Sequence, residues 1–385
     1  MILFCQISTN IINCNRTESS THYYQKIWDA RQDQGYVKPD DFWEIPNWVA
    51  ILRNNIQEAD FAIVRNIDEF VNFLNSSTYN YVCFSVLEAN KRLIREIIEK
   101  YTGKATFALG GYIDLKHYFV GYDNVAIFDT LQHFSALIVG DFKRGYDYSD
   151  FKGCQCIPRL TLSTGCWNKC SFCCVNRVVE EVPESEVVEQ IRSFKDLQFK
   201  LVYLNDKTFG QSKNHQLLPN ILKYIEEISQ DFEGVILQTT PRTFKKLSDD
   251  FLRASRVKFV ELGIETYNDP ILKAYKKPSK ESDIDQATQR FENLDAKLIP
   301  NIIIGFPEET KKSYQRTLDY LKRNKNLISH FNAYNLAIYT QAVIGHINDT
   351  NDKDELVLEK SFHQDEECHR WFHDEIFGLG LDLLD

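Results

Sequence analysis

The sequence predicts an α/β protein in two parts, a doubly wound parallel sheet followed by a (β/α)6 partial barrel. Short apolar runs alternate with helix-like segments in both halves of the chain, as in parallel sheets whose strands are joined by helices. A polar, turn-rich stretch over residues 141–158 separates the halves and is expected to be a linker. The length of 385 residues suits two domains or one large barrel.

The first predicted domain, residues 1–140, carries the doubly wound sheet. Helix-like segments over residues 67–74 and 89–101 separate some of its strand-like runs. Ligands of such sheets bind at the carboxyl ends of the strands. Residues 22–60 fit this alternation less well and are either an insertion covering a substrate cleft or a long connection packed by aromatic side chains. The strand-like runs are Ile2–Ile7, Phe61–Val64, Tyr81–Val86, Ala105–Leu109 and Val125–Phe128.

The second predicted domain, residues 159–340, carries the barrel, and an acidic, helical extension follows over residues 341–385. In parallel barrels the chemistry lies at the carboxyl ends of the strands. The expected strands are Arg159–Ser163, Leu201–Leu204, Gly234–Gln238, Lys258–Ile264, Leu298–Gly305 and Phe331–Ile338. The expected helices are Glu184–Phe194, Gln216–Ile228, Ser248–Ser255, Ile284–Leu294 and Lys311–Arg323.

Composition predicts a globular cytoplasmic protein. Hydrophobic residues make up 43% of the chain, and no stretch approaches the roughly 18–20 apolar residues of a membrane span. The N-terminus lacks the basic segment and long apolar run of a secretory signal, so the 10 cysteines are expected to be reduced thiols or metal ligands. The formal net charge of −10 makes a nucleic-acid partner less favoured.

Three cysteines directly follow the first barrel strand. Cys166, Cys170 and Cys173 have the spacing C-x3-C-x2-C, with Phe172 just before the third cysteine. This spacing resembles the cluster-binding motif of the radical S-adenosylmethionine (SAM) superfamily. The resemblance implies that three thiolates hold three irons of a 4Fe–4S cluster. The fourth iron would then chelate the amino and carboxylate groups of SAM.

Other uses of these cysteines are weaker explanations. A zinc site usually has four ligands in paired form, yet after Cys174 the only further cysteine is Cys368. Cys154 and Cys156 precede the motif, but the remaining ligands of a second cluster are not found, so this pair is expected to be structural. Near the C-terminus, His363, Cys368, His369 and His373 leave a second metal site open without assigning one.

Polar and glycine residues at the other strand ends extend the resemblance. Asn205 to Phe209 resembles the family's Asp-rich turn, residues 261–266 its Gly-Ile-Glu-Ser element, and residues 300–310 its Gly-Phe-Pro-Gly-Glu-Thr element. Two of the residues have plain structural alternatives: Asp206 as a helix N-cap, and Glu265 as the partner of a surface lysine. Arg242 follows the third barrel strand near the mouth, where an arginine suits either the SAM carboxylate or an anionic substrate. The candidate SAM residues are Asp206, Arg242, Gly263, Glu265, Gly305 and Pro307.

The first domain has a resemblance of its own. Ser85, Leu87, Gly110 and Gly111 look like the Ser-x-Leu and Gly-Gly elements of the cobalamin-binding domain found in a large radical SAM subfamily. In that subfamily a small hydroxyl and two glycines leave room for the nucleotide tail of the cofactor. However, no Asp-x-His-x-x-Gly follows Ile2–Ile7 to supply an axial histidine. Cobalamin is therefore either bound, or the domain retains an empty or repurposed cleft.

The predicted function is that of a radical SAM enzyme. The resemblance implies reductive cleavage of SAM to a 5′-deoxyadenosyl radical, with a ferredoxin- or flavodoxin-type protein as the reductant. The substrate is a small molecule or peptide that the sequence does not identify. One alternative is a cobalamin-dependent radical SAM methyltransferase. The other is a noncatalytic Fe–S binding or regulatory protein that keeps the fold.

Overall fold

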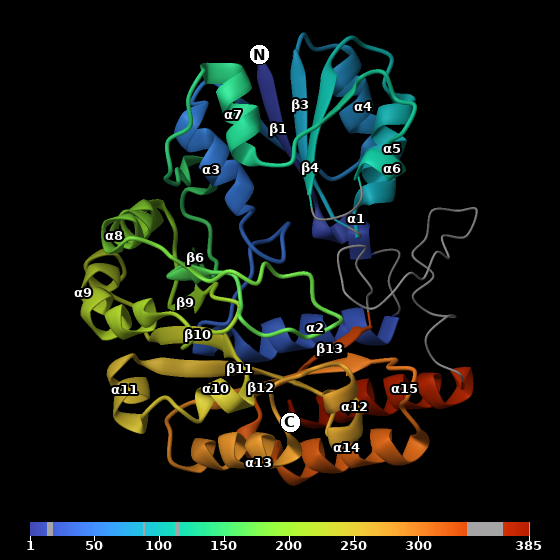
Figure 1. The fold of residues 1–385 in the computed structure, drawn as a ribbon. Helices are drawn as coiled ribbons and strands as arrows, with labels where there is room; N and C mark the ends of the chain where they lie inside the picture. Colours follow the sequence, from blue (N-terminus) through green and yellow to red (C-terminus); the bar gives the residue numbers. More distant parts are fainter. Residues whose placement is uncertain (14–17, 88, 112–114, 337–364, 385) are drawn as a thin grey trace. The chain divides into compact units, whose positions relative to one another are not determined.

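The computed structural model describes residues 1–13, 18–87, 89–111, 115–336 and 365–384 (Figure 1). The chain forms two compact units, which we call the N-terminal unit and the barrel unit. No helix within these described ranges is long and apolar enough to cross a membrane. The N-terminal unit comprises Met1–Thr17, Lys38–Cys156 and Arg192–Gln198, and the barrel unit comprises Glu18–Val37, Ile157–Ile191 and Phe199–Asp385.

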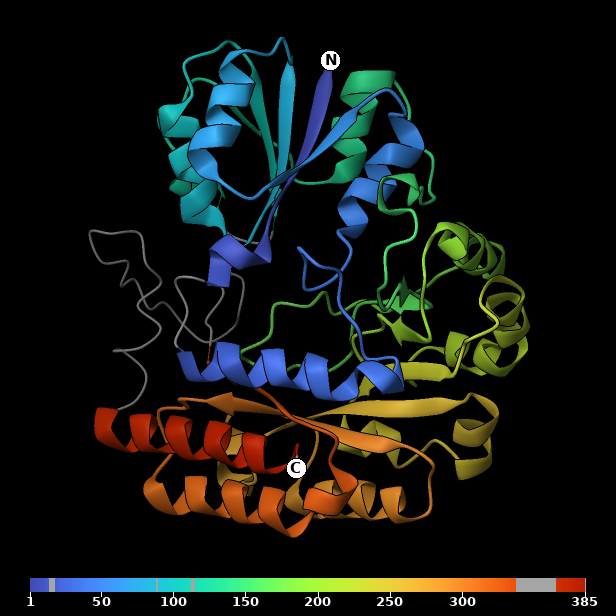
Figure 2. The same ribbon diagram turned by 180° about the vertical axis from the view of Figure 1, so that it is seen from behind.

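The N-terminal unit contains the predicted doubly wound sheet. Its five strands are all parallel, in the order β2-β1-β3-β4-β5. Helices α3 and α7 lie on one face of the sheet, and α4, α5 and α6 lie on the other (Figures 1 and 2). The strands are β1 Ile2–Ile7, β2 Asp60–Val64, β3 Tyr81–Val86, β4 Thr106–Gly111 and β5 Val125–Ile127, and the helices are α1 Thr9–Asn13, α3 Asn47–Asn55, α4 Ile67–Asn75, α5 Lys91–Lys100, α6 Leu115–Tyr118 and α7 Leu131–Val139.

The barrel unit contains a six-stranded parallel sheet in the order β13-β12-β11-β10-β9-β6. Spatial order follows chain order, as successive strand–helix repeats produce, and β6 does not pair with β13, so the barrel is partial as predicted. Its strands are β6 Arg159–Leu160, β9 Leu201–Leu204, β10 Gly234–Thr239, β11 Val257–Glu265, β12 Lys297–Ile304 and β13 Asn332–Asn335. Its outer helices are α8 Glu184–Ser193, α9 Leu218–Ile228, α10 Pro241–Phe244, α11 Asp249–Ala254, α12 Asp269–Ala274, α13 Glu281–Gln289 and α14 Lys311–Arg323.

The first barrel strand is shorter than the predicted run over residues 159–163. Of this predicted run, only the part that forms β6 joins the sheet, beside β9, whereas β7 (Ser163–Thr164) leaves the sheet and pairs antiparallel with β8 (Glu180–Glu181). Asp206 is the physical reason, because its carboxylate accepts hydrogen bonds from the amides of Leu162 and Ser163 at 2.9 and 3.1 Å. Those two amides therefore donate to a side chain that follows β9 instead of to the backbone of a neighbouring strand.

Helix α2 (Glu18–Arg31) belongs to the barrel unit, although residues 18–37 were expected in the first domain. The Tyr24 hydroxyl donates to the carbonyl of Ala333 and accepts from its amide, both at 3.2 Å. Tyr23 makes the same pair of bonds to Phe331, at 3.2 and 2.9 Å. These residues lie at or beside β13, whose edge would otherwise present unpaired backbone groups. Helix α2 therefore covers this edge of the sheet.

The residues between α2 and α3 pack through aromatic side chains. Within the barrel unit, Trp28 stacks on Tyr36 with ring centroids 4.8 Å apart, and Tyr36 meets the ring of His330 edge-on at 4.9 Å.

Of the predicted C-terminal extension, the structure describes residues 365–384, which contain helix α15 (Glu366–Asp382). Helix α15 runs beside α2 and α14 (Figures 1 and 2). The end of the predicted strand over residues 331–338 and His363 lie outside the described residues.

Candidate active site

The three motif cysteines lie in the loop that joins β7 to β8. Cys166 and Cys170 are buried, with 7% and 6% of their surfaces exposed, and Cys173 is half-buried. The amide of Cys173 donates to the carbonyl of Cys170 at 3.2 Å, which closes a tight turn between them. The loop follows β6, so it lies at the carboxyl end of a barrel strand, where parallel barrels place their chemistry.

The surroundings of Cys170 act on its thiol. Burial raises the pKa of Cys170, and the neighbouring Cys173 and Cys166 raise it further, whereas Lys277 lowers it. Among the described residues, no three His, Cys, Asp or Glu side chains are close enough together to hold a single metal ion. A 4Fe–4S cluster does not need its ligands that close, because each thiolate binds its own iron. Three neighbouring thiols on one short loop fit such a cluster.

The remaining cysteines near the motif and the C-terminus lie in other settings. Cys154 and Cys156 belong to the N-terminal unit, and burial raises the pKa of both thiols. Cys174 is half-buried, and burial also raises its pKa. On α15, Cys368 is buried, but within the described part of the chain it forms no metal site with His369 and His373.

Phe172 connects the cysteine loop to two other loops at the same ends of the strands. Its ring lies 6.4 Å from that of Tyr275 and 6.0 Å from that of Phe306, and the latter two rings are 4.6 Å apart. The amide of Ser171 donates to the carbonyl of Tyr275 at 3.0 Å. The aromatic residue before the third cysteine therefore holds the cysteine loop against the segments after β11 and β12.

Glu265 and Lys277 form a buried ion pair beside this loop. Their side chains are 10% and 6% exposed, and the Lys277 ammonium donates to Glu265 Oε1. Burial lowers the pKa of Lys277, but Glu265 and Cys170 raise it by more, so the net shift is upward. A Cβ atom at Gly263 would lie 2.7 Å from Lys277 Nζ, so a side chain at this position would displace the ammonium group from its present place.

Glu265 also has an unusual backbone conformation. Its φ is +67°, which is rare for a residue with a side chain. The pairing of β11 with β12 shifts register between Gly263 and Glu265, so an irregularity ends the strand there. Such strain persists where the surroundings hold it and is common at ligand sites. Here it directs the carboxylate toward Lys277. The structural alternative expected a surface lysine as the partner, but Lys277 is buried.

The loop after β12 carries Gly305 and Pro307 on either side of Phe306. Gly305 has φ +99°, and its amide donates to the Tyr314 hydroxyl at 3.1 Å. A Cβ atom at Gly305 would lie 3.1 Å from Cε1 of His369 on α15, so the turn leaves little space on that side. Through Phe306, this loop joins the group formed by the cysteine loop and the segment after β11.

The structure gives Asp206 a different role from SAM binding or helix capping. Besides the amides of Leu162 and Ser163, its carboxylate accepts a hydrogen bond from the Ser163 hydroxyl at 2.5 Å. It is only 1% exposed. Burial raises the pKa of Asp206, and these hydrogen bonds lower it. Asp206 thus fixes the start of the cysteine loop through three hydrogen bonds that its carboxylate accepts from the protein.

Arg242 also lies apart from the group around the cysteines. It is exposed on α10, and its amide meets the Ser279 hydroxyl at 3.3 Å. Its charge acts on Asp283 of α13, an outer helix, where it helps to lower the pKa of that carboxyl. Of these two cations it is Lys277, not Arg242, whose charge acts on a motif cysteine, Cys170. The sequence offered no signal for Lys277 except its position 12 residues after Glu265.

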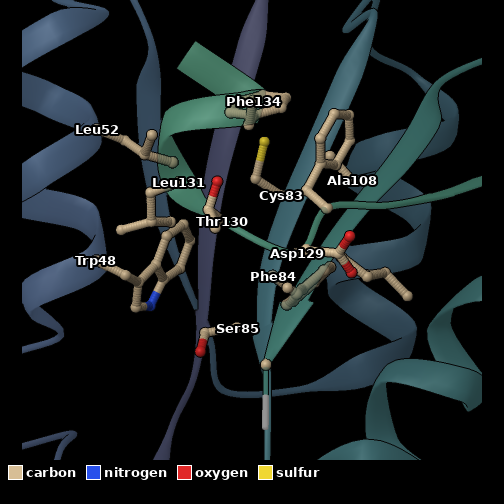
Figure 3. Close-up of a pocket in the computed structure, with 14 residues that line it drawn as sticks. Trp48, Leu52, Cys83, Phe84, Ser85, Ala108, Asp129, Thr130, Leu131 and Phe134 are labelled. Carbon is tan, nitrogen blue, oxygen red and sulfur yellow. The ribbon is translucent and has the colours of Figure 1, made fainter. Parts of the chain in front are cut away.

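The cobalamin-related residues of the N-terminal unit line a cavity of about 290 Å³ (Figure 3). Cys83 and Ser85 alternate along β3, directly beside Ala108 and Gly110 on β4. Alternate residues of a strand share one face, so these four small residues make the floor of the cavity. Trp48 and Leu52 from α3 and Thr130, Leu131 and Phe134 at the start of α7 form the walls (Figure 3).

The two glycines of this element have different surroundings. Gly110 lines the cavity, and a Cβ atom there would lie 3.5 Å from the Phe128 carbonyl oxygen. At Gly111 a Cβ atom would lie 2.1 Å from the Val86 carbonyl oxygen, so close strand packing already requires glycine. Leu87 is 40% exposed and does not line the cavity. The structure therefore brings Ser85, Gly110 and Gly111 together at the cavity, whereas Leu87 lies outside its lining.

Comparison with known proteins identifies the class of the barrel unit. Residues 160–321 match the model of the radical SAM superfamily, so this part of the chain is a radical SAM domain. Similar curated proteins are a probable threonylcarbamoyladenosine tRNA methylthiotransferase of Archaeoglobus fulgidus, 23% identical over 50% of each chain, and the ribosomal protein uS12 methylthiotransferase RimO of Thermosipho melanesiensis, 27% identical over 43% of this chain and 41% of RimO. The chain thus spans half or less of the length of these relatives.

Solved structures extend the likeness to the N-terminal unit at the level of fold. The radical SAM methyltransferase TsrM of Kitasatospora setae, with cobalamin and a 4Fe–4S cluster bound, matches with a TM-score of 0.59 over 89% of this chain and 77% of TsrM. The cobalamin-dependent radical enzyme OxsB matches with a TM-score of 0.54 over 86% of this chain and 53% of OxsB. The identities are only 12% and 13%, so these matches establish the fold alone.

Proposed function

We propose that this protein is a radical SAM enzyme whose 4Fe–4S cluster is held by Cys166, Cys170 and Cys173. When bound, the cluster supplies the electron that cleaves SAM to a 5′-deoxyadenosyl radical. One observation carries the proposal: the contacts of Phe172 with Tyr275 and Phe306 bring the cysteine loop together with the segments that hold the other candidate SAM residues. These segments are far apart in the sequence, and the parallel sheet brings them to the same edge.

The buried ion pair is suited to a zwitterionic ligand. We assign Lys277 to the carboxylate of SAM and Glu265 to its amino group or ribose hydroxyls, because opposite charges placed side by side match the two charges of an amino acid. The Gly305–Pro307 loop is assigned to the adenine, where backbone can approach a ring closely. Asp206 keeps a supporting role, because hydrogen bonds from the protein use its carboxylate.

The substrate and electron donor are proposed only as classes. The net charge of −10 favours a small molecule or peptide over a polynucleotide, since like charges repel. A ferredoxin- or flavodoxin-type protein is the proposed reductant. Among the relatives, the two methylthiotransferases are named for tRNA and for a ribosomal protein, and they show that similar domains serve substrates of different kinds.

Anaerobic reconstitution tests the proposal. The purified protein, treated with iron and sulfide and then with SAM and dithionite, is expected to form 5′-deoxyadenosine and consume SAM. A control without dithionite should form none, because cleavage needs an electron. The noncatalytic alternative predicts a stable cluster spectrum with no 5′-deoxyadenosine, and that result would overturn the proposed activity.

The cavity in the N-terminal unit favours a second candidate, a cobalamin-dependent radical SAM methyltransferase. Its floor of small residues and its walls of Trp48, Leu131 and Phe134 suit a flat aromatic ring such as the base of the cofactor's nucleotide tail. The described residues that line the cavity include no histidine. This candidate therefore depends on the tail rather than on an axial ligand from the cavity.

Cobinamide, a corrinoid without the nucleotide tail, separates binding of the tail from binding of the ring. Hydroxocobalamin is expected to bind at least about tenfold more tightly than cobinamide, since a buried aromatic base removes a large apolar area from water. Ala108→Leu should abolish this difference by filling the floor, whereas Ala136→Leu, at an exposed position of α7, should preserve it. Equal affinities in the unsubstituted protein would remove the candidate.

A further inference from the structure

Side chains, rather than regular secondary structure, hold the backbone of the cysteine loop. Arg177 contributes most of these contacts through one guanidinium group. Its Nη1 donates to the carbonyl of Asn168 at 2.5 Å, and its Nη2 donates to the carbonyls of Cys170 and Cys173 at 3.1 and 2.8 Å. Two of these three carbonyls belong to proposed cluster ligands, so the guanidinium fixes the spacing of Cys170 and Cys173.

Lysine cannot replace this arrangement. A guanidinium is a rigid planar fork with several donors, whereas an ammonium is a compact charge on a flexible stem. Arg177 therefore places both a fixed set of donors and a positive charge next to the proposed ligands.

Thr208 meets the first cysteine from the opposite direction. Its hydroxyl oxygen lies 3.2 Å from Cys166 Sγ, and the two residues are 4% and 7% exposed. In the structure this hydroxyl donates its single proton to the Lys207 carbonyl, 2.8 Å away, so donation to a metal-bound sulfur requires the hydroxyl to turn from that carbonyl toward Cys166. A sulfur bound to iron carries no proton, so the hydroxyl would then be the donor of the Thr208–Cys166 pair. Asp206, two residues earlier, fixes this segment against the start of the loop.

We propose that Thr208 and Arg177 are positioning residues of the cluster, with separable effects. Thr208 donates a hydrogen bond to the Cys166 sulfur and raises the reduction potential of the cluster, while Arg177 retains the cluster by fixing the loop backbone. The reduced cluster carries one more negative charge than the oxidised cluster, so a donor at a ligand sulfur stabilises the reduced state more. This inference rests on the proposed cluster ligands, but it does not require turnover of SAM.

Redox titration of the reconstituted holoprotein, followed by electron paramagnetic resonance of the reduced cluster, tests the Thr208 role. Thr208→Val preserves the shape of the side chain without the hydroxyl, and Thr208→Ser restores the hydroxyl. The reduced fraction of Thr208→Val at a fixed ambient potential is expected to fall several-fold, while Thr208→Ser should match the unsubstituted protein. Iron content per chain should be equal in all three. An unchanged potential in Thr208→Val would overturn the Thr208 role.

A chelator challenge of the same holoprotein tests Arg177. Arg177→Lys is expected to lose iron several-fold faster than the unsubstituted protein, while its potential changes little because the charge remains. Thr208→Val should lose iron at the normal rate. Normal retention in Arg177→Lys would overturn the Arg177 role, provided that circular dichroism shows both variants folded. A cluster that forms and responds in this way without yielding 5′-deoxyadenosine would contradict the proposed enzyme activity and leave this inference standing.

Discussion

Replacing Cys166, Cys170 or Cys173 by alanine is expected to abolish the iron–sulfur chromophore of the reconstituted protein and all formation of 5′-deoxyadenosine. Each thiolate would hold a different iron, so no neighbouring ligand can take over its position. The measurements are the visible absorption spectrum, the iron and sulfide content per chain, and 5′-deoxyadenosine after dithionite treatment.

Cys174→Ala is the matched control, because Cys174 is adjacent to the motif and half-buried. It should retain both the chromophore and the activity. Thermal unfolding of the four apoproteins would show whether any loss has a structural cause. A protein that needs Cys174 but not Cys173 would move the third ligand by one position and change the spacing from which the function was inferred.

The fold could be predicted closely where strands are buried on both faces. Such strands read as continuous apolar runs, and the observed β1, β3 and β9 have the predicted bounds. The placement of α2 could not be predicted. Tyr23 and Tyr24 form hydrogen bonds with Phe331 and Ala333, which lie 308 and 309 positions further along the chain. A helical pattern does not indicate which sheet the helix will cover.

The candidate site was readable where chemistry requires a particular residue type at a particular spacing. The cysteine motif meets this condition, and so do Glu265, the last residue of β11, and Gly305, the residue after β12. The contacts of Asp206 could not be predicted, because its partners are mostly backbone amides, which leave no trace in the sequence. Lys277 was missed for a related reason: next to Lys276 it looks like any surface lysine until the fold buries it.

Lys277→Met is expected to destabilise the apoprotein by about 3–5 kcal/mol, because it leaves the Glu265 carboxylate buried without its partner. The free energy of unfolding in urea measures this loss. The pKa of Lys277 is raised overall in the folded protein, although burial opposes the increase caused by Glu265. The stabilisation is therefore complete below the pKa of an unfolded lysine, about 10.4, and disappears as pH rises through the folded value. The stability difference should be constant near neutral pH and shrink only in strong alkali.

The double variant Glu265→Gln/Lys277→Met separates the structural effect of this pair from its role toward SAM. Removing both charges of a buried pair is often close to neutral, so most of the lost stability should return. Affinity for SAM, measured on the reconstituted holoprotein, should not return, since neither charge remains for the ligand's amino and carboxylate groups. If the double variant binds SAM normally, the ion pair only stabilises the fold around the cysteine loop, and the SAM carboxylate must be bound elsewhere.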